Sequence, residues 1–239
     1  VVTRYGVAYI ATPDAGVMRI DLQELSILSS WQSLGADNLE AAPIAVDGDL
    51  IYFGLTGFGI LLIDRHTSEI IDIWDADGTS GLPDNDVLSL HLDYFGGLIV
   101  GMEVPNSGGT SNQAMARWDG SSWEYFETDV PGGNNDPWKI NDIKSDSDGV
   151  VAATNRGVCT WTGWNIIQGN IYEWDECVSP MNTSARFSET FSIELVPLSS
   201  PLSDNCCTRI LAGHNEGASL INRGTGLSVV ERWTAGDDT

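Results

Sequence analysis

The chain has 239 residues and a formal net charge of −23, because 34 Asp and Glu residues oppose only 11 Lys and Arg residues. Nucleic-acid binding needs cationic side chains to neutralise phosphates, so the composition argues against a nucleic-acid partner, and the same charge disfavours an anionic membrane. We interpret the acidic balance as a solvated surface. The sequence has no apolar run long enough to insert into a bilayer, and its length suffices for a large core.

A short motif recurs along the chain and predicts its elements. A small residue closes an apolar run, a Gly or Ala follows after a variable spacer, and four residues beyond it stands a large apolar residue. The small residues, 43 to 59 positions apart, are Ala11, Gly54, Gly101, Ala153 and Ala212. Such a period, at its short end, is typical of a four-stranded propeller blade of roughly 40–50 residues. The sequence therefore predicts an all-β fold, a β-propeller of four-stranded antiparallel blades.

The second and third repeats show the four strands most clearly. Short apolar runs rich in β-branched and aromatic residues, bounded by Gly and Asp, predict strands at 44–46, 50–54, 60–63 and 70–74, and then at 87–92, 98–101, 115–118 and 123–126. Asp-Gly and Gly-Gly pairs between the runs suit hairpin turns. The strands are apolar on both faces, which is expected where neighbouring sheets cover both.

Five repeats account for almost the whole chain, which we predict to be a single domain. The predicted blades span about 1–39, 40–84, 85–138, 139–188 and 189–239. An alternative stays open: the first blade has a short first strand, and no terminal strand completes a split blade. The chain is then a fragment of a larger propeller.

The third repeat resembles the two-component-regulator propeller repeat, which reads Leu-Pro-x-Asn-x-Val, then an Asp-x-x-Gly turn, then an apolar strand. The matching residues are Leu82, Pro83, Asn85, Val87, Asp93 and Gly96. The fourth repeat is similar from Ile140 to Val158, while the first two look equally like quinoprotein-type repeats. The resemblance implies an extracellular or periplasmic sensor or recognition propeller, and it names no ligand because a fold alone does not set function.

All four cysteines lie in the last third of the chain, at positions 159, 177, 206 and 207. Cys177 lies in a long connection, and Cys206 and Cys207 lie between two strands of the last repeat. Irregular segments of this kind are often tied down by a disulfide, so we expect Cys177 to pair with Cys206 or Cys207. Cys159 is expected in mid-strand, either as a buried thiol or as the partner of the remaining one. A zinc site is disfavoured because the spacing lacks Cys-x-x-Cys pairs.

Candidate ligand-binding residues lie in the loops that share one face of a propeller, since loops on a rigid scaffold carry recognition. Arg156, His214, Asn215 and Glu216 form the most polar group among them. The complete set of candidate residues is Asp14, Phe58, Trp138, Asn155, Arg156, His214, Asn215 and Glu216.

Two acidic loops resemble calcium turns, at Asp75-Ala-Asp77-Gly78 and at Asp146-Ser-Asp148-Gly149. A full calcium loop needs Asp at its first position, whereas Ile73 and Lys144 stand there. We therefore interpret both as hairpin turns and expect no cofactor, with weak Ca²⁺ binding at the acidic surface left open.

Catalysis has little support, since no nucleophile elbow, zinc-protease motif or phosphate loop occurs. The leading hypothesis is a recognition module without catalysis that binds a glycan, a peptide or a protein partner on its loop face. The alternative is a propeller glycoside hydrolase or lyase that uses carboxylates at its channel. Its candidate carboxylates are Asp14, Asp86, Asp142, Glu103 and Glu216. A third possibility is a structural segment of a larger surface protein.

Overall fold

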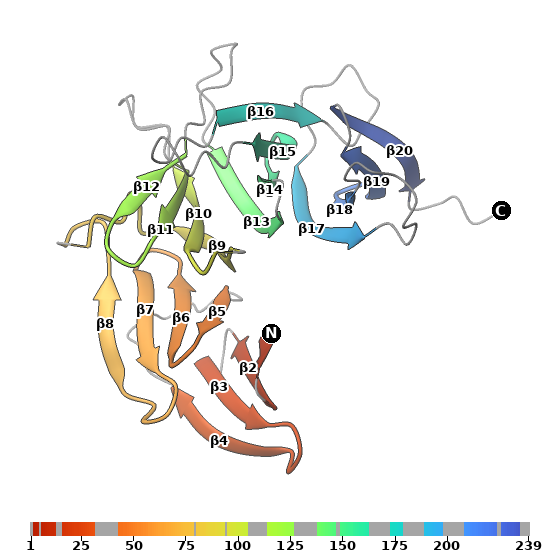
Figure 1. Cartoon of the computed structure of the whole chain (residues 1–239). Helices are drawn as coiled ribbons and strands as arrows, with labels where there is room; N and C mark the ends of the chain where they lie inside the picture. Colours follow the sequence, from red (N-terminus) through yellow and green to blue (C-terminus); the bar gives the residue numbers. More distant parts are fainter. Residues whose placement is uncertain are drawn as a thin grey trace. The chain divides into compact units, whose positions relative to one another are not determined.

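In the computed structural model the regular elements of the described chain are all strands (Figure 1). The structure describes residues 2–4, 6–12, 16–31, 43–78, 80–93, 95–104, 114–126, 138–146, 149–162, 173–178, 189–197, 208–223 and 226–234. None of these segments forms a helix that could cross a bilayer. The chain divides into two compact units, unit 1 (Val1–Val104 with Gln113–Tyr125) and unit 2 (Pro105–Asn112 with Phe126–Thr239).

Unit 1 contains three antiparallel meanders, in each of which four strands pair in chain order. The first comprises β1 (Val2–Arg4), β2 (Val7–Thr12), β3 (Gly16–Asp21) and β4 (Ser26–Trp31). The second comprises β5 (Ile44–Asp47), β6 (Leu50–Leu55), β7 (Gly59–Asp64) and β8 (Ile70–Trp74). The third comprises β9 (Val87–Leu92), β10 (Leu98–Val104), β11 (Met115–Trp118) and β12 (Trp123–Tyr125).

Unit 2 contains two more meanders of the same kind. One comprises β13 (Trp138–Asp146), β14 (Gly149–Thr154), β15 (Gly157–Thr162) and β16 (Glu173–Val178). The other comprises β17 (Thr190–Pro197), β18 (Thr208–His214), β19 (Gly217–Arg223) and β20 (Leu227–Thr234). The predictions of an all-β chain, of antiparallel sheets and of the strands in the second and third repeats are therefore confirmed.

Within each unit the cores lie between neighbouring meanders, which pack face to face. In β6 every residue from Ile51 to Leu55 is buried, on both faces of the sheet. One side packs against the first meander, where Tyr9 and Val17 join Phe53 in a buried cluster. This packing accounts for the continuous apolar strands, because alternate side chains of one strand point to two different neighbours.

Gly54, the small residue of the second repeat, lies where the third meander packs against the second. A Cβ atom on Gly54 would lie 2.5 Å from Cγ1 of Val87 and 2.6 Å from Cγ of Pro43. The later Gly starts the third strand in a left-handed conformation, with φ of +85° at Gly59, and a side chain there would overlap the carbonyl oxygen of Trp74. The motif is therefore a packing signature, set by backbone geometry and sheet separation.

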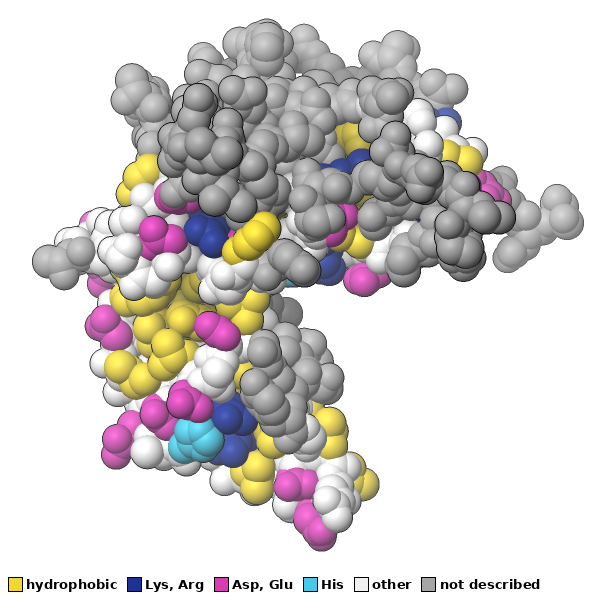
Figure 2. All heavy atoms as spheres, viewed as in Figure 1, with side chains coloured by type: hydrophobic (Ala, Val, Ile, Leu, Met, Phe, Trp, Pro, Cys, Tyr) yellow, Lys and Arg dark blue, Asp and Glu magenta, His cyan; other side chains and the backbone are white. Residues whose placement is uncertain are grey.

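The outer strand β8 is apolar although much of it faces solvent. Ile70, Ile71 and Ile73 are each about half exposed, and Trp74 is half-buried. Figure 2 shows apolar side chains gathered over the region of β7 and β8. The ring of Trp74 packs against Trp118 and Trp123, with ring centroids 5.1 Å and 5.7 Å away, so an aromatic cluster joins the second and third meanders.

The disulfide prediction was wrong. Cys177 lies in β16, an outer strand, and it stands directly opposite Cys159 in the register of β15 and β16. The two residues form a disulfide, so Cys177 is not available to Cys206 or Cys207, which lie outside the described residues. The error arose because the sequence placed Cys177 in an irregular connection, where its position opposite Cys159 could not be foreseen.

Candidate functional site

Most of the predicted ligand-binding residues lie in turns between the second and third strands of a meander. Phe58, in the β6–β7 turn, is 46% exposed. Asn155 and Arg156 form the β14–β15 turn, and Asn215 and Glu216 form the β18–β19 turn directly after His214. Trp138 is the first residue of β13, but its side chain is outside the described part of the chain, as is Asp14.

Unit 2 brings its two turns to the same edge. Ile140, near the start of β13, pairs with Thr154, and Thr190, at the start of β17, pairs with His214. The amide of Asn141 donates to the carbonyl oxygen of Thr190 at 2.8 Å, so the starts of β13 and β17 lie together. We call this region the turn edge. It comprises Lys139, Asn141, Asn155, Arg156, Glu189, Thr190, His214, Asn215 and Glu216.

The β14–β15 turn is held from two sides. The Asn155 N–H donates to the carbonyl oxygen of Lys139, and the Asn155 side-chain oxygen accepts from the Lys139 N–H, both at 3.2 Å. The Arg156 N–H donates to the hydroxyl of Thr154 at 2.9 Å. These bonds fix the backbone of the turn that carries the half-buried Arg156 side chain. The position of the Arg156 Cα atom is therefore well defined.

His214 organises the second turn from a buried position. Its Nδ1 accepts the N–H of Glu216 at 3.3 Å, so the ring proton lies on Nε2, which donates to the hydroxyl of Ser219 at 3.0 Å. Burial lowers the pKa of His214, opposed by the charge of Glu216, and favours the neutral ring. Ser219 is buried, so the contact between His214 and Ser219 lies inside the fold and holds the turn against β19.

Asp142 holds strands together. One carboxylate oxygen accepts from the N–H of Ile143 and from Nζ of Lys144, each at 2.9 Å. The other accepts from the N–H of Ile193 in β17 at 3.0 Å. Asp142, which the sequence offered as a candidate catalytic carboxylate, therefore has a structural role, because both of its oxygens accept hydrogen bonds within the fold.

Sequence reasoning did not single out Asn141, Glu189 or Ser219. Asn141 donates to the carboxylate of Glu189 at 3.4 Å as well as to Thr190. The sequence could have pointed to Asn141, because Asn141-Asp142-Ile143 in the fourth repeat matches Asn85-Asp86-Val87 in the third. Glu189 and Ser219 had no such signal, since their roles depend on strand register.

The corresponding edge of unit 1 lies near Phe58. The Gly59 N–H donates to the carbonyl oxygen of Asn85 at 3.0 Å, and the Glu103 N–H donates to that of Asp86 at 2.9 Å. The β6–β7 turn, the start of β9 and the end of β10 therefore meet there. This brings the backbones of two candidate carboxylate residues, Asp86 and Glu103, together.

Two aromatic side chains of β12 hold the loop that precedes β9. The indole N–H of Trp123 donates to the carbonyl oxygen of Ser80 at 2.8 Å, and the hydroxyl of Tyr125 donates to that of Gly81 at 2.9 Å. Within the loop, the side-chain oxygen of Asn85 accepts the N–H of Ala76 at 2.7 Å. The loop between β8 and β9 is therefore held by hydrogen bonds near its start, at Ala76, and near its middle, at Ser80 and Gly81.

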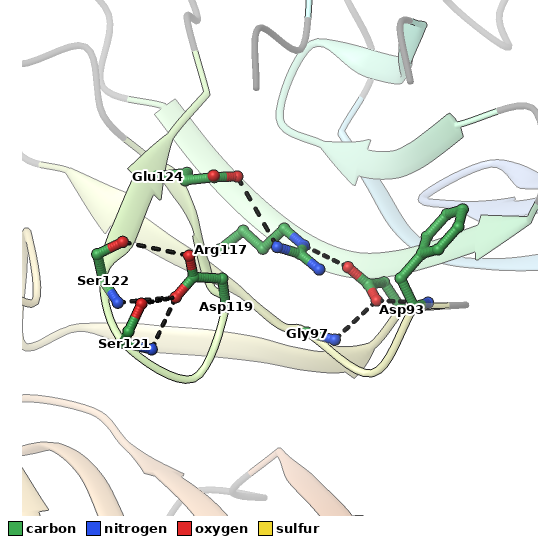
Figure 3. A network of polar contacts seen from close by, with 8 residues as sticks. Asp93, Gly97, Arg117, Asp119, Ser121, Ser122 and Glu124 are labelled. Carbon is green, nitrogen blue, oxygen red and sulfur yellow. Dashed lines mark hydrogen bonds and ion pairs between the residues drawn. The ribbon is translucent and has the colours of Figure 1, made fainter. Parts of the chain in front are cut away.

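The third meander also contains a buried ion pair (Figure 3). Nε of Arg117 contacts the carboxylate of Asp93, whose other oxygen accepts the N–H groups of Phe95 and Gly97, each at 2.8 Å. A side chain on Gly97 would overlap the Arg117 guanidinium. The Asp-x-x-Gly turn is therefore a scaffold element, and the Asp93 carboxylate is not a ligand site.

Figure 3 also shows two further carboxylates of the third meander. Glu124 lies 3.8 Å from its Nη1, and burial raises the pKa of Glu124 against the opposing effect of Arg117. Asp119 accepts hydrogen bonds from the backbone N–H groups and hydroxyls of Ser122 and Ser121, which lower its pKa to about 2. Across the described residues, no three His, Cys, Asp or Glu side chains gather to hold a metal ion.

No protein-family profile matches the sequence, and no curated protein matches it. Solved structures do match, at low sequence identity. The extracellular domain of BT4673 from B. thetaiotaomicron, described as a one-component system in one crystal structure and a hybrid two-component system in another, superposes with a TM-score of 0.68. The identities are 14% and 13%, over 97% of this chain and 27% of that domain.

Two other solved structures are similar as well. Saccharomyces cerevisiae Sqt1 matches at 11% identity with a TM-score of 0.59, over 95% of this chain and 59% of that one. A chain of the Mitotic Checkpoint Complex matches at 15% identity with a TM-score of 0.62, over 97% and 64%. The chain thus spans about a quarter of the BT4673 domain and less than two thirds of the others, with which it shares an all-β fold of antiparallel sheets.

Proposed function

We propose that the chain is an extracellular or periplasmic recognition module, built from the blades of a β-propeller of the two-component-regulator type. It binds a glycan, a peptide or a protein partner on its turns and does not act as a catalyst. The observation that supports the proposal is the turn edge of unit 2, where hydrogen bonds fix the backbone of two turns, one carrying Arg156 and the other carrying Asn215 and Glu216. Fixed turns with polar side chains suit recognition, because little conformational freedom is lost on binding.

Three further observations support this proposal. The BT4673 domains are described as extracellular parts of signalling systems, which fits a sensor module. The disulfide between Cys159 and Cys177 fits an oxidising compartment. The buried Nε2–H of His214 and the engaged carboxylate of Asp142 leave these two groups to structural roles.

Binding is tested by glycan arrays and peptide libraries, followed by calorimetry with the best ligand. Arg156→Ala and Glu216→Gln are expected to weaken binding at least tenfold. Arg65→Ala is the matched control, since it removes the same charge as Arg156→Ala from the β7–β8 turn of unit 1, where Arg65 pairs with Asp49, and it is expected to bind normally. Equal losses in Arg156→Ala and Arg65→Ala would contradict the proposed site.

The catalytic alternative is tested separately. The protein is incubated with a panel of polysaccharides, and reducing ends or unsaturated products are measured. No turnover is expected. Turnover abolished by Asp86→Asn or Glu103→Gln would overturn the proposal and assign the chemistry to the edge of unit 1.

A further inference from the structure

The disulfide between Cys159 and Cys177 lies next to the turn that carries Arg156. Cys159 stands opposite Ala152 of β14, two residues before Thr154, so Cys159 and Thr154 share one face of the sheet. Oγ1 of Thr154 lies 3.5 Å from Sγ of Cys159. The same oxygen accepts the N–H of Arg156 at 2.9 Å. One atom of Thr154 therefore connects the disulfide to the turn.

The hydroxyl of Thr154 closes this turn from inside the fold. It donates to the carbonyl oxygen of Gly157 at 3.0 Å and accepts the N–H of Arg156. Thr154 and Cys159 are both 0% exposed, so water does not compete for these hydrogen bonds. Because a hydroxyl has one proton and two lone pairs, its proton is used by Gly157 and a lone pair is used by Arg156.

The redox state of Cys159 changes what this hydroxyl meets. In the disulfide, Sγ of Cys159 has no proton and cannot donate to Thr154. In the thiol, Sγ carries a proton that can be donated to Oγ1 of Thr154, where it competes with the N–H of Arg156. In addition, two thiol sulfurs cannot stay at bonding distance, so Sγ of Cys159 has to move within a closely packed site. Both effects act on the hydrogen bond that fixes the turn.

The disulfide also holds the outer strand of the meander near the turn. Cys177 of β16 stands directly opposite Cys159 of β15, and the next pair toward the turn, Val158 and Val178, is the last pair of the two strands. Without the covalent bond, this end is held by backbone hydrogen bonds and packing alone. Because strand ends open more readily than strand centres, we expect the loss of the bond to loosen β15 where it leaves the turn.

We propose that the disulfide is a switch for the β14–β15 turn and that Thr154 is the positioning residue that transmits its state. With the bond formed, the backbone of Arg156 is held and the turn is ready to bind. With both cysteines reduced, the turn opens more often and binding at the turn edge weakens. The effect on binding rests on the proposed function, whereas the coupling between the disulfide and the turn does not.

The switch operates by thiol–disulfide exchange. On closing, the thiols of Cys159 and Cys177 give two electrons and two protons to the disulfide of an oxidant, which leaves as a dithiol. On opening, the thiolate of a dithiol reductant attacks Sγ of Cys177, which is half-buried, whereas Cys159 is fully buried. The Cys159 sulfur leaves and takes up a proton, and the second thiol of the reductant then releases Cys177. The chain therefore acquires its binding turn when it reaches an oxidising compartment.

The first experiment follows the exchange of backbone amide hydrogens by NMR and needs no ligand. The chain carries Cys206→Ser and Cys207→Ser, so that dithiothreitol acts on the Cys159–Cys177 bond alone. Reduction is expected to speed the exchange of the Arg156 N–H about tenfold or more. Reoxidation is expected to restore the slow exchange, which distinguishes the switch from irreversible unfolding.

The N–H of Glu216 is the internal control for general destabilisation. It is held by Nδ1 of His214 in the other turn of the same unit, so its exchange is expected to change little on reduction. Equal acceleration at Glu216 and Arg156 would show that the disulfide stabilises the whole unit and would overturn the proposal. An unchanged rate at Arg156 would overturn it as well.

Two variants test the hydroxyl that transmits the switch. Thr154→Val removes the hydroxyl and keeps a branched side chain, so the Arg156 N–H is expected to exchange fast in both redox states. Thr154→Ser keeps the hydroxyl and is expected to respond to reduction as the wild type does. If Thr154→Val responds to reduction as strongly as the wild type, the hydroxyl does not transmit the change.

Binding is measured by probing the same glycan arrays and peptide libraries with the oxidised and the reduced protein. The oxidised protein is expected to bind about tenfold more tightly or better, because the reduced protein holds the binding conformation for a smaller fraction of the time. If the exchange rates differ but neither form binds, the proposed recognition is wrong and the coupling stands. If a ligand binds both forms equally, the recognition stands and the switch is overturned.

Discussion

The carboxylate of Asp142 accepts a hydrogen bond at 3.0 Å from the backbone N–H of Ile193, a residue 51 positions later in the chain. This one contact joins the first strands of two successive meanders. Together with the bond from Asn141 to Thr190, it prevents β13 and β17 from sliding along each other. The two turns of the turn edge are therefore held at the same end of the two meanders.

Asp142→Ala removes the acceptor for the N–H of Ile193, for that of Ile143 and for Lys144. Because hydrogen bonds to a charged group contribute about 1.5–3 kcal/mol each and the carboxylate is partly exposed, we expect a loss of about 1–3 kcal/mol in the free energy of unfolding. Urea denaturation measures it. Glu69→Ala, at an exposed position of unit 1, is the control, and an equally small change in both variants would contradict the role of Asp142.

Arg117→Ala leaves the buried Asp93 carboxylate without its cation. We expect a loss of about 3–5 kcal/mol in the free energy of unfolding, the range found when one partner of a buried pair is removed. The double variant Arg117→Met with Asp93→Asn removes both charges and is expected to lose less. A loss below about 1 kcal/mol for Arg117→Ala, as for an exposed pair, would show that the charge is not effectively buried.

The pKa of His214 predicts a pH dependence of stability. Burial lowers this pKa below the usual value of 6.5, so the unfolded chain takes up a proton on this ring at a higher pH than the folded chain. The contribution to stability is present above about pH 6.5 and is lost as the pH falls toward the folded pKa. NMR titration of the ring should show a midpoint below 6.5, together with a change at the Glu216 amide. A midpoint at or above 6.5 would exclude the buried neutral ring.

The disulfide predicts a specific peptide and a specific loss. Proteolysis of the non-reduced protein should release Cys159 joined to Cys177. Cys177→Ser is expected to cost about 3 kcal/mol, since the bond closes a loop of 18 residues. Reduction of the wild type should give the same loss. A peptide that joins Cys177 to Cys206 or Cys207 would restore the pairing expected from the sequence.

The strands could be predicted because each one is marked by residues that are adjacent in the sequence. Apolar runs such as 50–54 and 60–63, with Gly and Asp at their ends, needed no tertiary information. The turns at Asn155–Arg156 and at Asn215–Glu216 were also predictable, since they occupy a fixed place in the repeat. The roles of Asp142, Ser219 and Cys177 were not, because each depends on which residue of another strand stands opposite, and the register between strands is not encoded in the spacing of one repeat.

Gly54 has a consequence for how such a chain can change. The Val87 and Pro43 side chains occupy the space that a methyl group would need. The absence of a side chain at Gly54 therefore allows the second and third meanders to pack at their observed distance. Connections between strands can lengthen freely, as the repeat spacing of 43 to 59 residues shows. A methyl group at residue 54, by contrast, would overlap the Val87 and Pro43 side chains, so these residues would have to shift. The connections can therefore change in length by more than ten residues, whereas position 54 does not accept even one additional carbon atom without a shift of its neighbours.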